Sequence, residues 1–375
     1  MPVIKLTHPS LAWTHYNPVH IISGIDVVEN LQKLIPQHKI LFITTKGFTN
    51  RGITAKVLKK FGRNRVIVYD HVNSYPELDD LDFLTNLYRN SGFNCILALG
   101  GGSVIDTAKV LGVTLLCHLE NPLNETLRQN NPHVWNQSLP VFAVPTTSGT
   151  GAEVTPFATV WDQSTSKKYS LFDKFLFPNI ALLDPTLTLT LPYKETLYTG
   201  LDAISHSLES LWNKNRTPIS ERLAIQSIKI AIKSFPNLLK ESENLYQRKQ
   251  MQISSLLAGL AISQTKTAIA HSISYPLTSY YDVPHGLACS FTLTTIAKIL
   301  LNERIVSNSQ MIFSLLEILE SLDLAYEINK YINYDKASNL ISFMITPERA
   351  GNFLRAIGKD EIDMILQESF GHQCH

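Results

Sequence analysis

Hydrophobic positions follow two different patterns in the two halves of this chain. In the first half, short runs of apolar and β-branched residues alternate with stretches in which apolar residues recur at helical spacing. The short runs predict buried strands over residues 39–45, 65–70, 95–100 and 141–147. Because regular alternation of strands and helices is typical of a doubly wound fold, we predict an α/β domain with a parallel sheet.

The second half of the chain has a different pattern. The β-branched runs stop after residues 182–192, and long amphipathic stretches follow, which predicts a largely helical region. A chain of 375 residues is longer than one hydrophobic core usually serves. We therefore expect two domains, an α/β domain over residues 1–185 and an all-helical domain over residues 186–375.

Composition argues against several classes of partner. A charged fraction of 17% and a net charge of +1 give no general attraction for nucleic acid or an anionic membrane. The N-terminal residues lack the pattern of a signal peptide. The longest apolar tract, residues 95–119, is interrupted by Asp106, Lys109 and four glycines, so no membrane span is predicted. The four cysteines form no CxxC pair, which favours a cytoplasmic protein.

A glycine-rich loop, Gly100-Gly101-Gly102-Ser103, connects a predicted strand to a predicted helix. Glycines there let the backbone approach a phosphate, and the helix N-terminus offers free N–H groups. The alternative is a tight turn with Ser103 as the helix cap, and the loop does not match the GxGxxG fingerprint of dinucleotide-binding folds. A second loop, residues 144–155, is rich in hydroxyls and glycine and could hold the other end of the same ligand.

Four residues in the helical half could form a metal site. Asp202 and His206 are four residues apart, so they share one face of a helix, and His271 and His285 follow later. One carboxylate and three imidazoles suit Fe²⁺, Zn²⁺, Mn²⁺ or Co²⁺, and no thiolate is offered. The alternative is that each histidine is a hydrogen-bonded core or surface residue, with Asp202 and His206 as a buried pair.

The segments GGGSVIDTAK, PTTSGTGAEVT, DAISHSLES and PHGLA resemble the signature segments of the iron-containing (group III) alcohol dehydrogenases. The resemblance runs in order from about residue 15 to about residue 300. It implies a dinucleotide-binding N-terminal domain and a helical domain that binds metal and substrate. It also implies that one metal ion, Fe²⁺ or Zn²⁺, is bound by the four residues just described.

The resemblance further implies an activity and a set of cofactor-binding residues. The activity is hydride transfer between NADH or NADPH and a small aldehyde or alcohol, in a homodimer or larger homo-oligomer. The cofactor residues fall in the two loops and at one lysine before the domain boundary: Gly101, Gly102, Ser103, Thr146, Thr147, Gly149 and Lys168.

The sequence departs from the family's pattern at two places in the predicted site. Many members have a histidine four residues after the third metal ligand, where this chain has Tyr275. Its hydroxyl could relay a proton, although packing beside Pro276 is the simpler interpretation. Where NAD-specific members often have an aspartate, this chain has Thr45 followed by Lys46. Without that carboxylate nothing repels a 2′-phosphate, so NADPH is expected to be accepted.

Two further cations suggest an anionic substrate. Lys214 and Arg216 follow the helix of the first two metal ligands, which we expect to end near Trp212. They are either cations at the mouth of the cleft or charges that stabilise the end of a helix. The next helix is expected to begin near Pro218 with Thr217 as its cap.

The segments SHSLESLWNKN and HSISYPLTSYYDVPHG look closest to the phosphonoacetaldehyde reductase branch of the family, so phosphonoacetaldehyde is a candidate substrate. The main rival is a sugar-phosphate cyclase of the dehydroquinate synthase type, a lyase with the same overall fold. The Asp-x3-His pair argues against that rival. A third interpretation is a nucleotide-binding module without catalysis.

Overall fold

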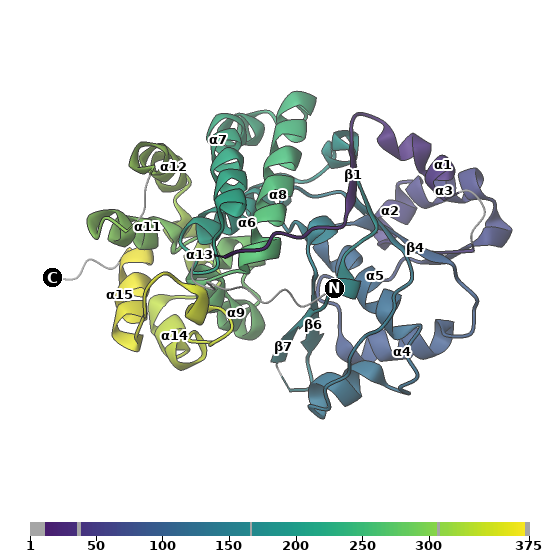
Figure 1. Cartoon of the computed structure of the whole chain (residues 1–375). Helices are drawn as coiled ribbons and strands as arrows, with labels where there is room; N and C mark the ends of the chain where they lie inside the picture. The colour runs from purple at the N-terminus through teal and green to yellow at the C-terminus, as the bar shows by residue number, and fades with distance from the viewer. Residues whose placement is uncertain (1–11, 36–38, 166, 306–307, 372–375) are drawn as a thin grey trace.

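The computed structural model describes residues 12–35, 39–165, 167–305 and 308–371 of the chain. Figure 1 shows a sheet with its helices on the right, in purple to blue, and a group of helices on the left, in green to yellow. The short hairpin of β6 and β7 lies where the two groups meet (Figure 1). The molecule therefore has the α/β part and the helical part that the hydrophobic pattern predicts.

The main sheet has six parallel strands in the order β1-β8-β5-β4-β2-β3. The strands are β1 His20–Ser23, β2 Ile40–Ile43, β3 Val66–Tyr69, β4 Cys95–Gly100, β5 Val141–Pro145 and β8 Ile180–Leu183. The four predicted strands are β2 to β5, with ends that differ by up to two residues. Sequence reasoning missed β1 and β8, each of which is a single run of four residues.

Helices cover both faces of this sheet. Side chains alternate between the faces, so Leu41 and Ile43 join one hydrophobic cluster while Ile40 and Phe42 join another. The helices of this part are α1 Leu31–Leu34, α2 Lys46–Asn50, α3 Ile53–Phe61, α4 Leu78–Tyr88 and α5 Gly102–Thr114. A separate antiparallel hairpin, not predicted from the sequence, follows β5 and consists of β6 Phe157–Asp162 and β7 Lys167–Phe172.

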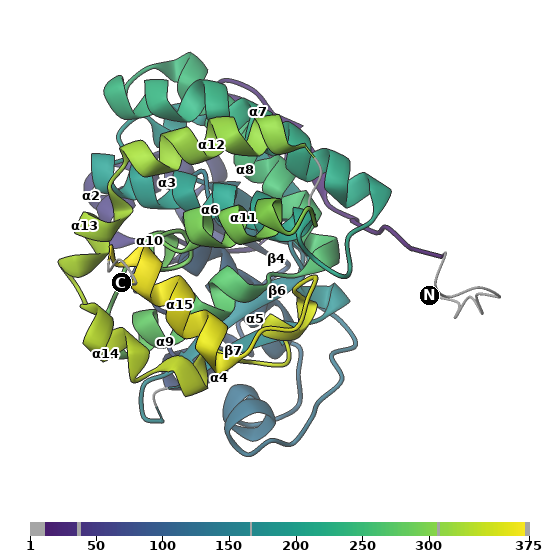
Figure 2. The same ribbon diagram turned by 90° about the vertical axis from the view of Figure 1, so that its left-hand side faces the viewer.

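Ten helices of the described chain make up the other part, and Figure 2 shows them facing the viewer. They are α6 Tyr193–Leu211, α7 Pro218–Lys240, α8 Leu245–Thr265, α9 Ile269–Tyr281, α10 His285–Ala288, α11 Leu293–Asn302, α12 Ser309–Ser321, α13 Leu324–Asn329, α14 Tyr334–Ser338 and α15 Lys359–Ser369. Among the described residues, no helix is both long enough and apolar enough to cross a membrane. The last strand ends at Leu183 and α6 begins at Tyr193. The division into two domains at residue 185 remains a prediction.

Helix α6 lies at the centre of the helical part. Most of its side chains are buried, and it packs against α7, α8 and α10. It ends at Leu211 with Trp212 as its cap, as expected. The expected start of α7 is also confirmed, because Thr217 forms a capping box with Ser220.

The two parts meet through contacts between glycine backbones. Gly151, with φ of +62°, follows β5, and Gly259 lies inside α8. A Cβ added to Gly259 would lie 2.8 Å from Gly151 Cα and 2.9 Å from Val154 Cγ2. The backbone on one side and a buried valine on the other leave no room for a methyl group. Glycine at position 259 is therefore required for this close approach.

We predict that Gly259→Ala destabilises the protein although alanine favours helix formation by about 1 kcal/mol. Forcing a methyl group into this contact is expected to cost about 1–3 kcal/mol, since neither backbone can move away without separating the two parts. The measurement is the thermal unfolding midpoint by circular dichroism. The matched control is Gly351→Ala, where an added Cβ meets nothing within 4 Å. Equal midpoints for the two variants would contradict the close packing described here.

Candidate active site

The glycine loop and the hydroxyl-rich loop lie side by side at the carboxyl ends of β4 and β5. The Thr146 backbone N–H donates to the Gly100 carbonyl at 3.0 Å. A Cβ added to Gly102 would lie 2.8 Å from Thr150 Cγ2, so this glycine allows the two loops to touch. Parallel α/β proteins bind ligands at this edge of the sheet, which supports a shared role of the two loops in binding one ligand.

The residue that caps helix α5 is Gly101, so the alternative in which Ser103 is the cap is wrong. Ser103 lies inside the first turn, and its hydroxyl donates to the Ser74 carbonyl. Gly101 and Gly102 therefore expose the first backbone N–H groups of α5 without a side chain in front of them. This arrangement suits a phosphate at the positive end of the helix.

Helix α6 connects the hydroxyl-rich loop to the candidate metal ligands. A Cβ added to Gly149 would lie 2.5 Å from the Thr199 carbonyl oxygen, so the loop rests directly on the backbone of α6. His206, one turn from Asp202, has its Nδ1 3.3 Å from the Gly149 carbonyl oxygen. When the Nδ1–H of His206 donates a hydrogen bond to that carbonyl, Nε2 carries no proton in the neutral ring, and this is the nitrogen that faces Asp202.

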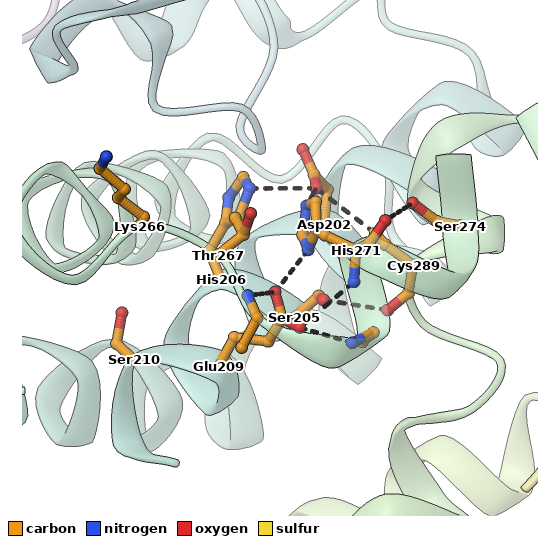
Figure 3. Close-up of polar contacts among 12 residues, drawn as sticks. Asp202, Ser205, His206, Glu209, Ser210, Lys266, Thr267, His271, Ser274 and Cys289 are labelled. Atoms are coloured by element: carbon orange, nitrogen blue, oxygen red, sulfur yellow. Dashed lines mark hydrogen bonds and ion pairs between the residues drawn. The ribbon is translucent and has the colours of Figure 1, made fainter. Parts of the chain in front are cut away.

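Three imidazole nitrogens converge on one carboxylate oxygen. The Nε2 atoms of His206, His271 and His285 lie 3.4, 3.6 and 3.9 Å from Asp202 Oδ1. These side chains come from α6, α9 and the start of α10. Figure 3 shows Asp202, His206 and His271 pointing toward one another. The structure therefore brings together the four residues that the sequence singled out.

Glu209 fixes the orientation of the His271 ring by accepting a hydrogen bond from its Nδ1–H. The Nδ1–H of His271 donates to Glu209 Oε2 at 2.6 Å. The same carboxylate accepts the backbone N–H groups of Ala268, Ala270 and His271 at 3.0, 2.6 and 3.2 Å (Figure 3). Sequence reasoning missed this residue. Its position was nevertheless readable, because Glu209 lies three residues after His206 and shares its helix face.

The atoms of this cluster fit a divalent metal ion. His271 Nε2 is buried and makes no hydrogen bond, since the proton of the ring already goes to Glu209 through Nδ1. A buried polar nitrogen without a partner is costly, and a cation bound between it and Asp202 would remove that cost. Nitrogen and oxygen donors of this kind, with a carboxylate behind one histidine, are typical of Fe²⁺ and Zn²⁺ sites.

Asp202 and two of the imidazoles have the charge that metal binding needs. For His271, burial acts to lower the pKa, but Glu209 and Asp202 outweigh it and raise the pKa overall. Burial lowers the pKa of His206, and burial together with Lys168 lowers the pKa of His285, so both rings are neutral. Burial opposes ionisation of Asp202, but the neighbouring imidazoles hold the pKa of that carboxyl well below its usual value. A negative carboxylate and neutral imidazoles are the forms that bind a cation.

A thiol that the sequence analysis did not consider lies beside the cluster. Cys289 Sγ lies 3.5 Å from Asp202 Oδ1, and one ligand atom each of Asp202, His271, His285 and Cys289 fall within 4.8 Å of one another. Burial, with Asp202 adding to it, raises the pKa of this thiol, so Cys289 keeps its proton and donates a hydrogen bond to Asp202. Its spacing of four residues from His285 was the signal that sequence reasoning overlooked.

A cleft of about 780 Å³ connects the loops with this cluster. Its lining includes Gly102 and Ser103 from the glycine loop, Lys168 from β7, all four candidate metal ligands, and Tyr275 from α9. The Lys168 Nζ lies 3.6 Å from the centre of the Tyr275 ring. Burial, followed by the charge of Arg349, lowers the pKa of Lys168 to about 7.

Tyr275 lies beside the cluster rather than within it. Its ring centre is 6.4 Å from that of His271 and 6.0 Å from that of His285. Burial raises the pKa of Tyr275, so its hydroxyl keeps its proton at neutral pH. The role of this hydroxyl in proton transfer stays a prediction.

Thr45 follows β2 and caps α2, which begins at Lys46. Because β2 is the neighbour of β4, Thr45 lies along the same edge of the sheet as the glycine loop. No acidic residue follows in the first turn of α2. This position is where a dinucleotide would place the ribose of its adenosine, and the expected acceptance of NADPH stays a prediction.

Lys214 and Arg216 do not line the cleft, so their expected place at its mouth is wrong. The Lys214 Nζ donates to the Gly351 carbonyl at 3.1 Å, and Arg216 Nη1 donates to the Leu211 carbonyl at 2.9 Å. Arg216 thus satisfies a free carbonyl at the end of α6, the structural alternative considered from the sequence. The cations that line the cleft are Lys168, Lys266 and Arg349. Sequence reasoning missed Arg349 because nothing near it in the chain marks a site.

Comparison with known proteins agrees with this geometry. The family model described as "Iron-containing alcohol dehydrogenase" matches residues 18–185. The model described as "Fe-containing alcohol dehydrogenase family, C-terminal" matches residues 196–367. Together the two matches cover most of the chain.

Individual relatives point the same way. The chain is 29% identical over 286 residues to a sulfoacetaldehyde reductase of Bilophila wadsworthia, covering 75% of this chain and 73% of that protein. It is 30% identical over 285 residues to a 1,3-propanediol dehydrogenase of Citrobacter freundii, covering 74% and 71%. The crystal structure of an iron-containing alcohol dehydrogenase from Thermotoga maritima superposes with a TM-score of 0.81 at 28% identity, covering 96% and 100% of the two chains. A sulfoacetaldehyde reductase from Bifidobacterium kashiwanohense in complex with NAD+ has the same fold, with a TM-score of 0.85 at 24% identity, covering 97% and 100%.

We predict that Glu209→Gln lowers affinity for divalent metal by about ten- to a hundredfold, the usual effect of losing a carboxylate behind a histidine ligand. Both oxygens of Glu209 accept hydrogen bonds. In glutamine an NH₂ group replaces one of these oxygens, so a donor would face another donor. The measurement is metal content together with a Co²⁺ titration followed by absorbance. The control is Glu195→Gln, an exposed position on the same helix. Equal metal retention in both variants would show that Glu209 does not position His271 for a ligand.

Proposed function

Because the chain belongs to the iron-containing alcohol dehydrogenase family, we propose that it is a metal-dependent, NAD(P)-linked aldehyde reductase or alcohol dehydrogenase. The observation that carries the proposal is the convergence of three Nε2 atoms on Asp202 Oδ1 in a cleft that also reaches the glycine loop. The experiment that tests it is a screen of aldehydes with NADH and NADPH on metal-reconstituted protein, followed by nicotinamide absorbance.

Each part of the site then has a task in the reaction. A divalent ion bound by the four ligands would supply Lewis acidity toward the oxygen of an aldehyde or alcohol. Glu209 holds His271 in place, and the Gly149 carbonyl does the same for His206. The cleft between the two parts shields the reacting groups from bulk water, which strengthens electrostatic interactions inside it.

The two loops and Lys168 bind the cofactor in this proposal. The backbone N–H groups of Gly101, Gly102 and Ser103 face the pyrophosphate at the N-terminus of α5. Thr146 and Thr147 adjoin the glycine loop and Gly149 rests on α6, and in this proposal the three hold the nicotinamide side of the cofactor. The cofactor carries the hydride, and the task of the protein is to align it with the carbonyl carbon.

Neither rival interpretation has comparable support. The sugar-phosphate cyclase alternative is not favoured, since both family models and the relatives named above are those of alcohol dehydrogenases and aldehyde reductases. A nucleotide-binding module without catalysis does not explain why three histidines converge on Asp202. Turnover of nicotinamide with an aldehyde would exclude both.

We further propose a small aldehyde with an anionic group, of which phosphonoacetaldehyde is the candidate, as the physiological substrate. The unpaired cations in the cleft support it, as does similarity to reductases whose names give sulfoacetaldehyde, an aldehyde with a sulfonate, as substrate. A cytoplasmic location and assembly into homodimers or larger homo-oligomers are part of the same proposal, by resemblance to the family.

We predict that His271→Ala removes stoichiometric metal and lowers turnover at least about a hundredfold, the usual worth of a Lewis acid in such a reaction. Metal content by atomic emission and turnover with propanal are measured on the same preparation. The control is His118→Ala, an exposed histidine in the α/β part. A His271→Ala variant that keeps both metal and full activity would refute the proposed ligand set.

We predict that wild-type protein uses NADPH at least as well as NADH and that Thr45→Asp shifts the preference toward NADH. A carboxylate at the end of β2 would repel a 2′-phosphate and accept hydrogen bonds from a ribose with free hydroxyls. The measurement is kcat/KM for both cofactors with one aldehyde, and Thr45→Asn provides the uncharged control. Wild-type turnover with NADH alone would show that Thr45 does not select the cofactor.

A further inference from the structure

Three cations among the described residues line the cleft without forming an ion pair, although Asp106, Asp202 and Glu348 line it as well. In the part of the chain that the structure describes, no ion pair joins Lys168, Lys266 or Arg349 to a carboxylate. By contrast, Arg128 forms ion pairs with Asp79 and Asp162 at 3.0 Å each. Lys168 and Arg349 lie against the same Tyr275 ring, so their positive charges repel one another, and a bound anion would relieve that repulsion.

Arg349 is the cation best placed to act on a substrate. Its guanidinium carbon lies 3.9 Å from the centre of the Tyr275 ring, a cation–π distance. The same ring lies 6.0 Å, centre to centre, from the ring of His285. The Tyr275 ring is therefore a common neighbour of the guanidinium and of the ligand cluster, so a small substrate in this part of the cleft lies near both.

The segment that carries Arg349 is fixed to the site by hydrogen bonds. The Arg349 N–H donates to the Thr346 carbonyl, and the Thr346 N–H donates to the hydroxyl of Ser272, the residue after His271. At the other end, the Asn352 side chain donates to the Thr267 carbonyl at 2.9 Å. The cation is thus held in a set position relative to α9 rather than on a free loop.

The other two cations are less suited to this task. The Lys168 ammonium lies on the Tyr275 ring, and Lys168 belongs to the residues assigned to the cofactor. It is also a point charge without a planar pair of donors. The Lys266 ammonium lies 4.4 Å from the Phe172 ring, and Figure 3 shows its side chain directed away from Asp202. A guanidinium, by contrast, is always charged and offers two parallel N–H groups to a pair of oxygens.

We propose that Arg349 binds the anionic group of the substrate and so sets the specificity for short aldehydes that carry a phosphonate or a sulfonate. This inference rests on the proposed reductase function and adds the residue that selects the substrate. The tetrahedral group would place two of its oxygens on the guanidinium, while the aldehyde end reaches the ligand cluster. Tyr275, between the two ends, limits the length of chain that fits.

The test compares wild type with Arg349→Ala, Arg349→Lys and the control Arg222→Ala, which removes an exposed arginine on α7. The value of kcat/KM is measured with phosphonoacetaldehyde, sulfoacetaldehyde and propanal, and KM is measured for the nicotinamide. We expect Arg349→Ala to lose about ten- to a hundredfold on the anionic aldehydes and little on propanal, because a charge-assisted bond is lost. Arg349→Lys should recover part of the loss, since lysine keeps the positive charge but lacks the paired N–H donors of a guanidinium.

A second readout does not depend on turnover. Ethylphosphonate and ethanesulfonate, which have no carbonyl group, should bind wild-type holoenzyme and the Arg222→Ala variant with equal affinity by calorimetry. Their binding should weaken about ten- to a hundredfold in Arg349→Ala. The stronger of the two ligands shows whether the site prefers the phosphonate or the sulfonate.

Three results would overturn the proposal: equal losses on propanal and the anionic aldehydes, an effect confined to KM for the nicotinamide, or a wild type without preference for anionic aldehydes. The proposed function fails in a different way. If no aldehyde is reduced while the inert anions still require Arg349 for binding, the reductase activity is wrong and the anion site stands. If propanal is reduced without discrimination by charge, the activity stands and the role of Arg349 is wrong.

Discussion

The buried carboxylate of Glu209 is the interaction on which the site depends. A charge without exposure to water is stable only when its hydrogen bonds are satisfied, and burial here opposes ionisation while His271 and backbone N–H groups lower the pKa of Glu209. The backbone donors belong to residues 268–271, at the start of α9, where a helix has N–H groups without partners. One side chain on α6 therefore sets both the start of α9 and the direction of its histidine.

Close backbone contacts at glycines join the loop after β5 and the start of α10 to the long helices. Gly149 lies against Thr199, Gly151 against Gly259, and the backbone at Gly286 against Tyr198, each closer than a Cβ would allow. These contacts place the hydroxyl-rich loop and the start of α10 directly on the long helices. The two loops and the candidate metal ligands consequently share one rigid framework, although they come from different parts of the chain.

Sequence patterns predicted the features that depend on local order. The strands β2 to β5 are continuous apolar runs, and the capping of α7 by Thr217 follows from neighbouring residues. The four candidate metal ligands were found because their types and spacing carry the chemistry. Glu209 and Cys289 were missed although they lie at helical spacing from those ligands. Lys214 and Arg216 were misplaced because only the tertiary structure shows that they bind carbonyls at the end of α6 and on a distant segment.

The segment that carries Arg349 is a place where substrate specificity can change during evolution. One end of the segment is fixed by a hydrogen bond from a backbone N–H to the Ser272 hydroxyl, and the other by a hydrogen bond from a side chain to the Thr267 carbonyl. Side chains between these two ends face the cleft. Exchanging those side chains leaves the buried carboxylates and the contacts between glycines untouched. New substrate ranges can therefore arise by mutation in a few surface positions, without loss of the reaction chemistry or of stability.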